Sequence, residues 1–141
     1  MANDVSGKRL TATLNHVQLH ISDRTRSFPF YRDLLGYLGF DVVREDERSL
    51  GMRSGGADIW LRETSEDRKG KEYNRKNTGL NHIAFCVDSK EDVDRFHEEF
   101  LIPRSIRPLY GPPRSYPEYT PTYYAVCFED PDRIKVEVMS L

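Results

Sequence analysis

The sequence predicts an α+β protein built from two similar halves, and three observations carry that prediction. Strand-like stretches, in which apolar and polar residues alternate, flank two stretches whose apolar residues recur every three or four positions, as in helices. The order strand, helix, strand, strand, strand occurs twice. The tetrapeptide Leu-Asn-His-Val at residues 14–17 returns as Leu-Asn-His-Ile at residues 80–83, an offset of 66 residues (82 − 16). Two such halves each carry a sheet with one face to cover, and pairing the two curved sheets would enclose a shared cavity.

The first half spans about residues 14–62. Alternation over residues 14–21 predicts a strand, and Ser22 and Asp23 follow it as a plausible helix cap. The helix keeps one apolar face, formed by Phe28, Tyr31, Leu34, Leu35 and Leu38. Three short strands are expected after it, at residues 40–44, 49–53 and 58–62.

Residues 63–79 are expected to link the halves, because this segment is highly charged and too poor in large apolar residues to order itself well. The second half, about residues 80–139, opens with a strand over residues 80–87. Ser89, with Asp92 three residues on, starts a helix in the manner of a capping box. Strands are expected at residues 106–110, 123–128 and 134–139, with a proline-rich excursion over residues 111–121.

Length and composition narrow the class of protein. A chain of 141 residues favours one domain, residues 1–141. The net charge of −2 and the absence of a long block of like charge argue against a nucleic-acid partner. No apolar run reaches the roughly 18 residues of a membrane span, so no membrane partner is expected. Two cysteines and no apolar leader favour the cytoplasm.

Three residues stand where metal ligands would be useful. His16 and His82 occupy equivalent places in the repeat, and a pseudo-twofold relation between the halves could bring such places together. Glu137 lies among apolar residues of the last strand, where an unpaired charge is expensive to bury. Two imidazoles and one carboxylate suit a divalent ion of Fe, Mn, Zn, Ni or Co. The alternative is that both histidines are structural and that Glu137 faces solvent.

Four segments, taken in order, resemble the vicinal oxygen chelate superfamily, which includes glyoxalase I, extradiol dioxygenases, fosfomycin-resistance thiol transferases and bleomycin-resistance proteins. The segments are LNHV at residues 14–17, SFPFYRDLLG at 27–36, GLNHIAF at 79–85 and EDPDRIKVE at 129–137. The resemblance implies two βαβββ modules that form an incomplete barrel around a shared cavity. It also implies a metal held by a His of the first strand, a His that opens the second module and a Glu of the last strand. By motif match these are His16, His82 and Glu137.

The chain departs from the family pattern at three positions. Trp60 stands where glyoxalase I has a fourth ligand, a Glu, so the three-ligand arrangement of dioxygenases or fosfomycin transferases is the closer resemblance. Cys127 stands ten residues before Glu137, where those enzymes resemble one another in having a Tyr. Tyr123, four residues before Cys127 and on the same strand face, is the candidate catalytic hydroxyl. Arg133 replaces the Gly of the usual Asp-Pro-Asp-Gly turn.

Further residues are candidates for contacts with a substrate. Gln18 and His20 share a strand face with His16. Relatives carry a substrate-binding Arg at the position of His20, so an acid/base or anion-orienting role is expected, with a structural histidine as the alternative. Trp60 is either a cavity wall or an ordinary packed aromatic. Arg114, in the proline-rich excursion, is placed to meet an anionic substrate if that loop gates the cavity, and a stiff connector is the alternative.

These observations lead to an expected function. We expect a metal-dependent enzyme that acts on a small oxygen-bearing substrate, with dioxygenase-like or isomerase/lyase-like chemistry. The alternative is a metal-free small-molecule-binding protein of the bleomycin-resistance type, which would not need the three ligands. Relatives of this size commonly pair as homodimers and sometimes form each site from modules of both subunits, so a homodimer is expected here.

Overall fold

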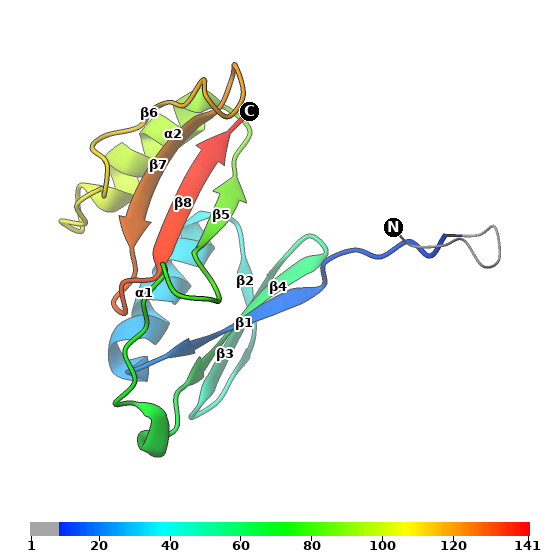
Figure 1. The fold of residues 1–141 in the computed structure, drawn as a ribbon, viewed down its shortest axis with the longest axis vertical. Helices are drawn as coiled ribbons and strands as arrows, with labels where there is room; N and C mark the ends of the chain where they lie inside the picture. Colours follow the sequence, from blue (N-terminus) through cyan, green and yellow to red (C-terminus); the bar gives the residue numbers. More distant parts are fainter. Residues whose placement is uncertain (1–8) are drawn as a thin grey trace.

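The computed structural model describes residues 9–141 and shows two four-stranded sheets with a helix against each (Figure 1). The strand order is β1-β4-β3-β2 in the first sheet and β5-β8-β7-β6 in the second. In each sheet the first strand of the module pairs in parallel with the last, and the other pairs are antiparallel. The predicted α+β class and the repeated module are therefore confirmed. The two sheets stay separate, so the described part of the chain forms no closed barrel.

The first module follows the predicted order closely. Its elements are β1 (His16–Ile21), α1 (Arg24–Tyr37), β2 (Asp41–Glu45), β3 (Ser49–Ser54) and β4 (Ala57–Glu63). Asp23 caps α1, because its carboxylate accepts a hydrogen bond from the Thr25 backbone N–H at 2.9 Å. Along β1 the odd-numbered residues point to the core side and the even-numbered residues are exposed. This alternation places His16, Gln18 and His20 on one open face.

The second module repeats this arrangement, but its second strand is only two residues long. Its elements are β5 (His82–Cys86), α2 (Lys90–Phe96), a π-helical continuation (His97–Leu101), β6 (Arg114–Ser115), β7 (Tyr124–Glu129) and β8 (Lys135–Ser140). The expected cap is present, since the Ser89 hydroxyl accepts the Asp92 backbone N–H at 3.1 Å. Within residues 9–141, every helix falls short of the length and apolar character that a membrane span requires.

The strand predicted at residues 106–110 is wrong. Toward β7 this segment contributes a backbone hydrogen bond from Leu109 N–H to Cys127 C=O, at 2.9 Å. It also forms an isolated bridge between Leu109 and Gly111, and Ile106 N–H donates back to the Leu101 carbonyl at 3.0 Å. The strand that pairs with β7 is instead β6, two residues long. Pro108, Pro112 and Pro113 lack the backbone N–H that a paired strand donates, which explains why apolar residues alone misled the prediction.

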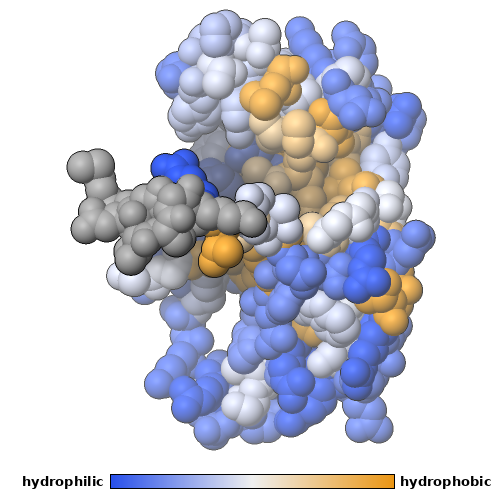
Figure 2. Space-filling model, turned by 90° about the vertical axis from the view of Figure 1, so that its right-hand side faces the viewer, coloured by the Kyte–Doolittle hydropathy of each residue, from blue (hydrophilic) through white to orange (hydrophobic). Residues whose placement is uncertain are grey.

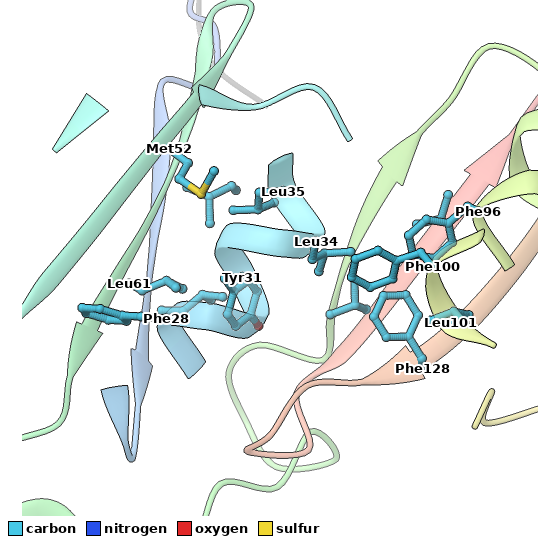
Figure 3. Packing of buried hydrophobic residues seen from close by; sticks show 14 of the residues in the cluster. Phe28, Tyr31, Leu34, Leu35, Met52, Leu61, Phe96, Phe100, Leu101 and Phe128 are labelled. Carbon is cyan, nitrogen blue, oxygen red and sulfur yellow. The ribbon is translucent and has the colours of Figure 1, made fainter. Parts of the chain in front are cut away.

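One apolar core joins the two modules. Leu34 of α1 faces Phe96, Phe100 and Phe128 of the second module (Figure 3), and all four belong to a single buried cluster. The ring of Tyr37 lies 5.7 Å from the ring of Phe96 and 5.6 Å from that of Phe100. Burying each of the four clustered side chains stabilises the fold by about 1.5–3 kcal/mol. The modules are thus joined through the helical side. On the opposite faces, β1 of the first sheet exposes its even-numbered residues, whereas Tyr116 and Tyr123 cover part of the second sheet at Ala125 and Met139.

A turn of the second module also closes onto the first. The Tyr31 hydroxyl donates a hydrogen bond to the carboxylate of Asp130 at 2.6 Å, and both residues are buried. The Ser22 backbone N–H donates to Asp132 at 2.9 Å, and the Ser22 hydroxyl donates to the same carboxylate. These contacts connect residues about a hundred positions apart, so the turn of residues 130–132 ties β1 and α1 to the second module.

The segment between the modules follows a defined path along both of them. It contains a short 3₁₀ helix (Glu66–Arg68), and the Lys69 ammonium contacts Glu66 at 2.7 Å. The Tyr73 hydroxyl donates to the Leu80 carbonyl at 2.6 Å. The side chain of Arg75 lies 3.6 Å from Glu129 of the second module. Charged and polar contacts thus hold a segment that, from its lack of large apolar residues, was not expected to order itself well.

Candidate functional site

His82 and Glu137 meet on the open face of the second sheet. The register of β5 and β8 pairs Ala84 with Glu137, so His82 lies two residues before the Glu137 partner and on the same face. The Nε2 atom of His82 is 3.4 Å from Oε2 of Glu137. The Glu137 side chain is only 7% exposed and that of His82 is 38% exposed, so the carboxylate is sheltered while the imidazole reaches solvent.

Tyr123 holds the other oxygen of this carboxylate. Its hydroxyl donates to Oε1 of Glu137 at 2.6 Å. Burial raises the pKa of Tyr123, and the hydrogen bond to Glu137 raises it further, so the phenol stays protonated at neutral pH. Cys127 lies directly opposite Glu137 in the ladder. Burial and then the Glu137 charge raise the pKa of this thiol to about 11, which keeps it un-ionised.

His16 lies on the first sheet and does not join this pair within one chain. It is exposed, and its Nδ1 lies 2.8 Å from Oδ1 of Asn15. Among residues 9–141, no group of three or more His, Cys, Asp or Glu side chains is arranged to hold a metal ion. A single chain therefore brings together two of the three residues that the sequence suggested as ligands, and leaves His16 apart.

Trp60 stands at the first-module counterpart of Glu137. Ala84 pairs with Glu137 in the second sheet, and Gln18 pairs with Trp60 in the first, each two residues after the repeated histidine. The first module thus carries an indole where the second carries a carboxylate. The ring covers Gly51, because a Cβ atom on Gly51 would lie 2.5–2.7 Å from three ring carbons of Trp60.

Replacing Gly51 by Ala is therefore expected to displace the indole. Overpacking of this kind destabilises proteins by about 1–3 kcal/mol. Urea unfolding measures the free energy of unfolding, and the emission of Trp60, the single tryptophan of the chain, reports its surroundings. Gly56→Ala is the matched control, since a Cβ there meets nothing within 4 Å. Equal stability and emission in Gly51→Ala and wild type would contradict the tight packing of Trp60 on Gly51.

Gln18 and His20 line a separate cavity of about 680 Å³ between β1 and the linking segment. The Gln18 amide lies 3.3 Å from Nε2 of His20. His20 also borders a second, more polar cleft of about 360 Å³, together with Arg68 and Lys71. Both residues are accessible to a small molecule, but neither cavity contains His82 or Glu137.

Arg114 belongs to an aromatic stack beside Tyr123. Its guanidinium lies 3.9 Å from the ring centre of Tyr116. Tyr116 stacks on Tyr119 with a centroid distance of 5.6 Å, and Tyr123 packs edge-on against both rings. The stacked rings orient the guanidinium of this exposed residue, and its Nη1 donates to the Ser115 carbonyl at 3.5 Å. A guanidinium held in this way is suited to an anionic group. Sequence reasoning identified Arg114 and Tyr123 but missed the tyrosines that hold them.

Sequence reasoning also passed over Asn15 and Asn81. Each asparagine precedes a repeated histidine, and its side-chain oxygen lies 2.8 Å (Asn15) or 2.7 Å (Asn81) from the Nδ1 atom of that histidine. From the sequence, the tetrapeptide indicates a duplication and a family motif, and only its histidine receives a role. Its recurrence in both halves was the available signal that the asparagine, as well as the histidine, has a defined place.

The residues present fit a divalent metal only in part. An imidazole nitrogen and a carboxylate oxygen on one face are ligands that first-row divalent ions accept. The sheltered carboxylate has a phenol on its other oxygen, which orients it toward His82. One more protein donor would give the arrangement of three ligands with open positions that metal enzymes use.

Known proteins share both the sequence and the fold of this chain. The chain is 32% identical over 127 residues to YqjT of Bacillus subtilis (strain 168), a protein without an assigned function, and the match covers 90% of this chain and 98% of YqjT. It is 29% identical over 125 residues to the metallothiol transferase FosB of Staphylococcus haemolyticus, covering 89% of this chain and 81% of FosB.

A solved structure from Bacillus halodurans, of a candidate glyoxalase, has a TM-score of 0.79 at 32% identity, over 91% of this chain and 95% of that chain. The model of the Glyoxalase/Bleomycin resistance protein/Dioxygenase superfamily matches residues 13–138, which is nearly the whole sequence. Together with the duplicated module and the shared fold, this match shows that the chain belongs to the Glyoxalase/Bleomycin resistance protein/Dioxygenase superfamily.

Proposed function

We propose that the protein is a divalent-metal-dependent enzyme that acts on a small oxygen-bearing substrate. The observation that carries the proposal is the 3.4 Å approach of His82 Nε2 to the sheltered carboxylate of Glu137. A metal ion is a partner that both the imidazole nitrogen and the carboxylate oxygen accept, and its charge would balance the sheltered carboxylate whose other oxygen Tyr123 holds.

The third ligand in this proposal is His16 of a second copy of the chain. Within one chain His16 lies on the other sheet. The repeat nevertheless gives His16 and His82 equivalent positions at the start of a strand, and each contacts the asparagine that precedes it. The face seen in Figure 2 is hollowed, and apolar residues gather beside the hollow over the second module. A homodimer that covers this face with the first module of its partner would complete the ligand set.

A bound divalent ion would supply Lewis-acid polarisation of a substrate oxygen. Tyr123 keeps Glu137 oriented and offers a protonated hydroxyl beside it. Arg114, stacked on Tyr116, offers N–H groups to an anionic part of the substrate. Gln18, Trp60 and His20 of the first module are the proposed contacts from the opposite wall, with His20 as the candidate acid or base.

The similarity to FosB makes thiol transfer the first reaction class to test. Trp60 in place of a fourth carboxylate supports a three-ligand site and therefore favours transferase-like or dioxygenase-like chemistry over a four-ligand isomerase. Metal identity narrows the chemistry further, because iron suits dioxygen chemistry, whereas nickel or zinc suits isomerisation and manganese suits either dioxygen chemistry or thiol transfer.

Metal content tests the proposal directly. Protein purified without chelator is expected to hold metal near one ion per chain, and His82→Ala and Glu137→Ala are each expected to lose it. Elemental analysis of the three proteins provides the measurement. His97→Ala is the matched control, because His97 lies on the helical side of the second module, away from Glu137. It should keep the wild-type metal content.

The second candidate function is a metal-free binding protein of the bleomycin-resistance type. The observation that favours it is that one chain assembles only two of the three expected ligands. Wild-type protein that stays metal-free after anaerobic reconstitution with Fe, Mn, Zn, Ni and Co would refute the enzyme proposal in favour of this one.

A further inference from the structure

We infer that Asn15 and Asn81 are positioning residues that set the tautomer of His16 and His82, so that Nε2 is the nitrogen free to bind a metal. The inference rests on the proposed function for its purpose, but the hydrogen-bond pattern from which it follows involves only this chain. A neutral imidazole protonates one nitrogen and leaves a lone pair on the other, so control of the proton also decides which nitrogen can be a ligand.

The second module determines the direction of the hydrogen bond at His82. The Asn81 amide nitrogen donates to the backbone carbonyl of Arg75 at 3.0 Å, and a carbonyl can only accept. The other end of the amide, Oδ1, therefore faces His82, where it lies 2.7 Å from Nδ1. An amide oxygen can only accept, so Nδ1 of His82 must carry the proton. In the neutral ring the lone pair is then on Nε2.

That lone pair is on the correct side of the ring. Nε2 is the atom of His82 that lies 3.4 Å from the Glu137 carboxylate. The unprotonated nitrogen and the carboxylate are both electron-pair donors, so a cation between them would stabilise this arrangement. The first module repeats the contact with the histidine, since Asn15 Oδ1 lies 2.8 Å from Nδ1 of His16, whereas the anchor on a backbone carbonyl is seen for Asn81. Metal-binding histidines usually hold their second nitrogen in such a hydrogen bond, which orients the ring and raises its basicity.

This assignment also explains the linking segment. The Arg75 carbonyl orients the Asn81 amide, and Arg75 is itself held by its side-chain contact with Glu129 at 3.6 Å. The Tyr73 hydroxyl ties Leu80, the residue before Asn81, to the same segment. Residues 73–80 thus lead from the first module to the face that carries His82 and Glu137, and the Arg75 carbonyl in this segment orients the Asn81 amide.

Long-range ¹H–¹⁵N NMR of metal-free, ¹⁵N-histidine-labelled protein reads which nitrogen of each neutral ring carries the proton. In the wild type we expect His16 and His82 to be protonated at Nδ1. In Asn81→Leu, His82 is expected to become a mixture of both tautomers while His16 keeps its signal, and in Asn15→Leu the effect is reversed. Asn81→Asp, which retains an acceptor oxygen, is expected to restore the wild-type pattern. His97 is the internal control.

Zinc titration with a competing chromophoric chelator then measures the consequence. Asn81→Leu is expected to weaken zinc binding about 10–100-fold, and Asn81→Asp to recover most of it. Thermal unfolding of each variant checks that it folds. If Asn81→Leu fails to fold, Asn15→Leu supplies an independent test. Wild-type rings protonated at Nε2, or tautomers unchanged in both leucine variants, would overturn the inference. Tautomers as expected in a protein that binds no zinc would support the tautomer assignment and overturn the metal proposal instead.

Discussion

A heterodimer of His16→Ala and His82→Ala chains is expected to bind metal although neither variant binds it alone. If each site combines His16 of one copy with His82 and Glu137 of the other, one site in this heterodimer has lost two ligands and the other keeps all three. The purified heterodimer should therefore hold about half the metal of the wild-type dimer, with about half of any metal-dependent activity. Co-expression with two affinity tags isolates it, and elemental analysis gives the metal content.

The matched control combines His82→Ala with Glu137→Ala. His82 and Glu137 of a site come from the same copy of the chain. One site of this heterodimer therefore lacks His82 and the other lacks Glu137, and no recovery is expected. A metal-free His16→Ala/His82→Ala heterodimer would contradict the shared site, since it would mean that the three ligands have to come from one chain. The two heterodimers carry the same number of substitutions, so a general effect on folding does not imitate the expected difference.

The second large effect is expected at Asp130, in the turn that joins the modules. Burial raises the pKa of this carboxyl from 3.8 to about 6, despite hydrogen bonds from Tyr31 and from the Ile134 and Asp132 backbone N–H groups that favour the charged form. The folded protein therefore binds this proton more tightly than the unfolded chain does. The stabilisation is fully present below about pH 4 and is lost as the pH rises through about 6.

Asp130→Asn removes this titration and keeps the shape of the side chain. The free energy of unfolding of the wild type, relative to Asp130→Asn, is expected to fall by about 3 kcal/mol between pH 3 and pH 7, since one pKa unit corresponds to about 1.4 kcal/mol. Urea unfolding at a series of pH values measures it. Tyr31→Phe is the control: it removes a hydrogen bond to the carboxylate, so the pKa of Asp130 should rise further. A pH-independent difference between wild type and Asp130→Asn would disprove the raised pKa.

Much of the fold could be predicted because its determinants are local. Asp23 and Ser89 cap the two helices as expected, since a cap needs only a side-chain oxygen next to the first free backbone N–H groups. The alternation of residues 16–21 and 82–86 placed both repeated histidines on open faces, because side-chain direction in a strand follows from sequence parity alone.

Prediction failed where a residue type leaves several conformations open. The apolar residues of 106–110 favoured a strand, but proline chemistry leaves them almost without ladder pairing. Arg133 adopts a φ of +66°, the left-handed conformation usual for Gly, although its sequence position marked only a departure from a familiar turn. Its neighbours in the 130–132 turn hold it there through contacts to Ser22 and Tyr31, which lie in the other module.

The sequence by itself determined the two modules, the strand faces and the identity of the residues that could hold a metal, because repetition and periodicity are properties of the chain. Only the tertiary structure decided which of those residues meet. It brought His82, Glu137 and Tyr123 together, turned Asn81 toward His82 and left His16 on the other sheet. The physical reason is that the distance between two side chains on different sheets depends on how the helices and the 130–132 turn pack the modules, and no local pattern records that packing.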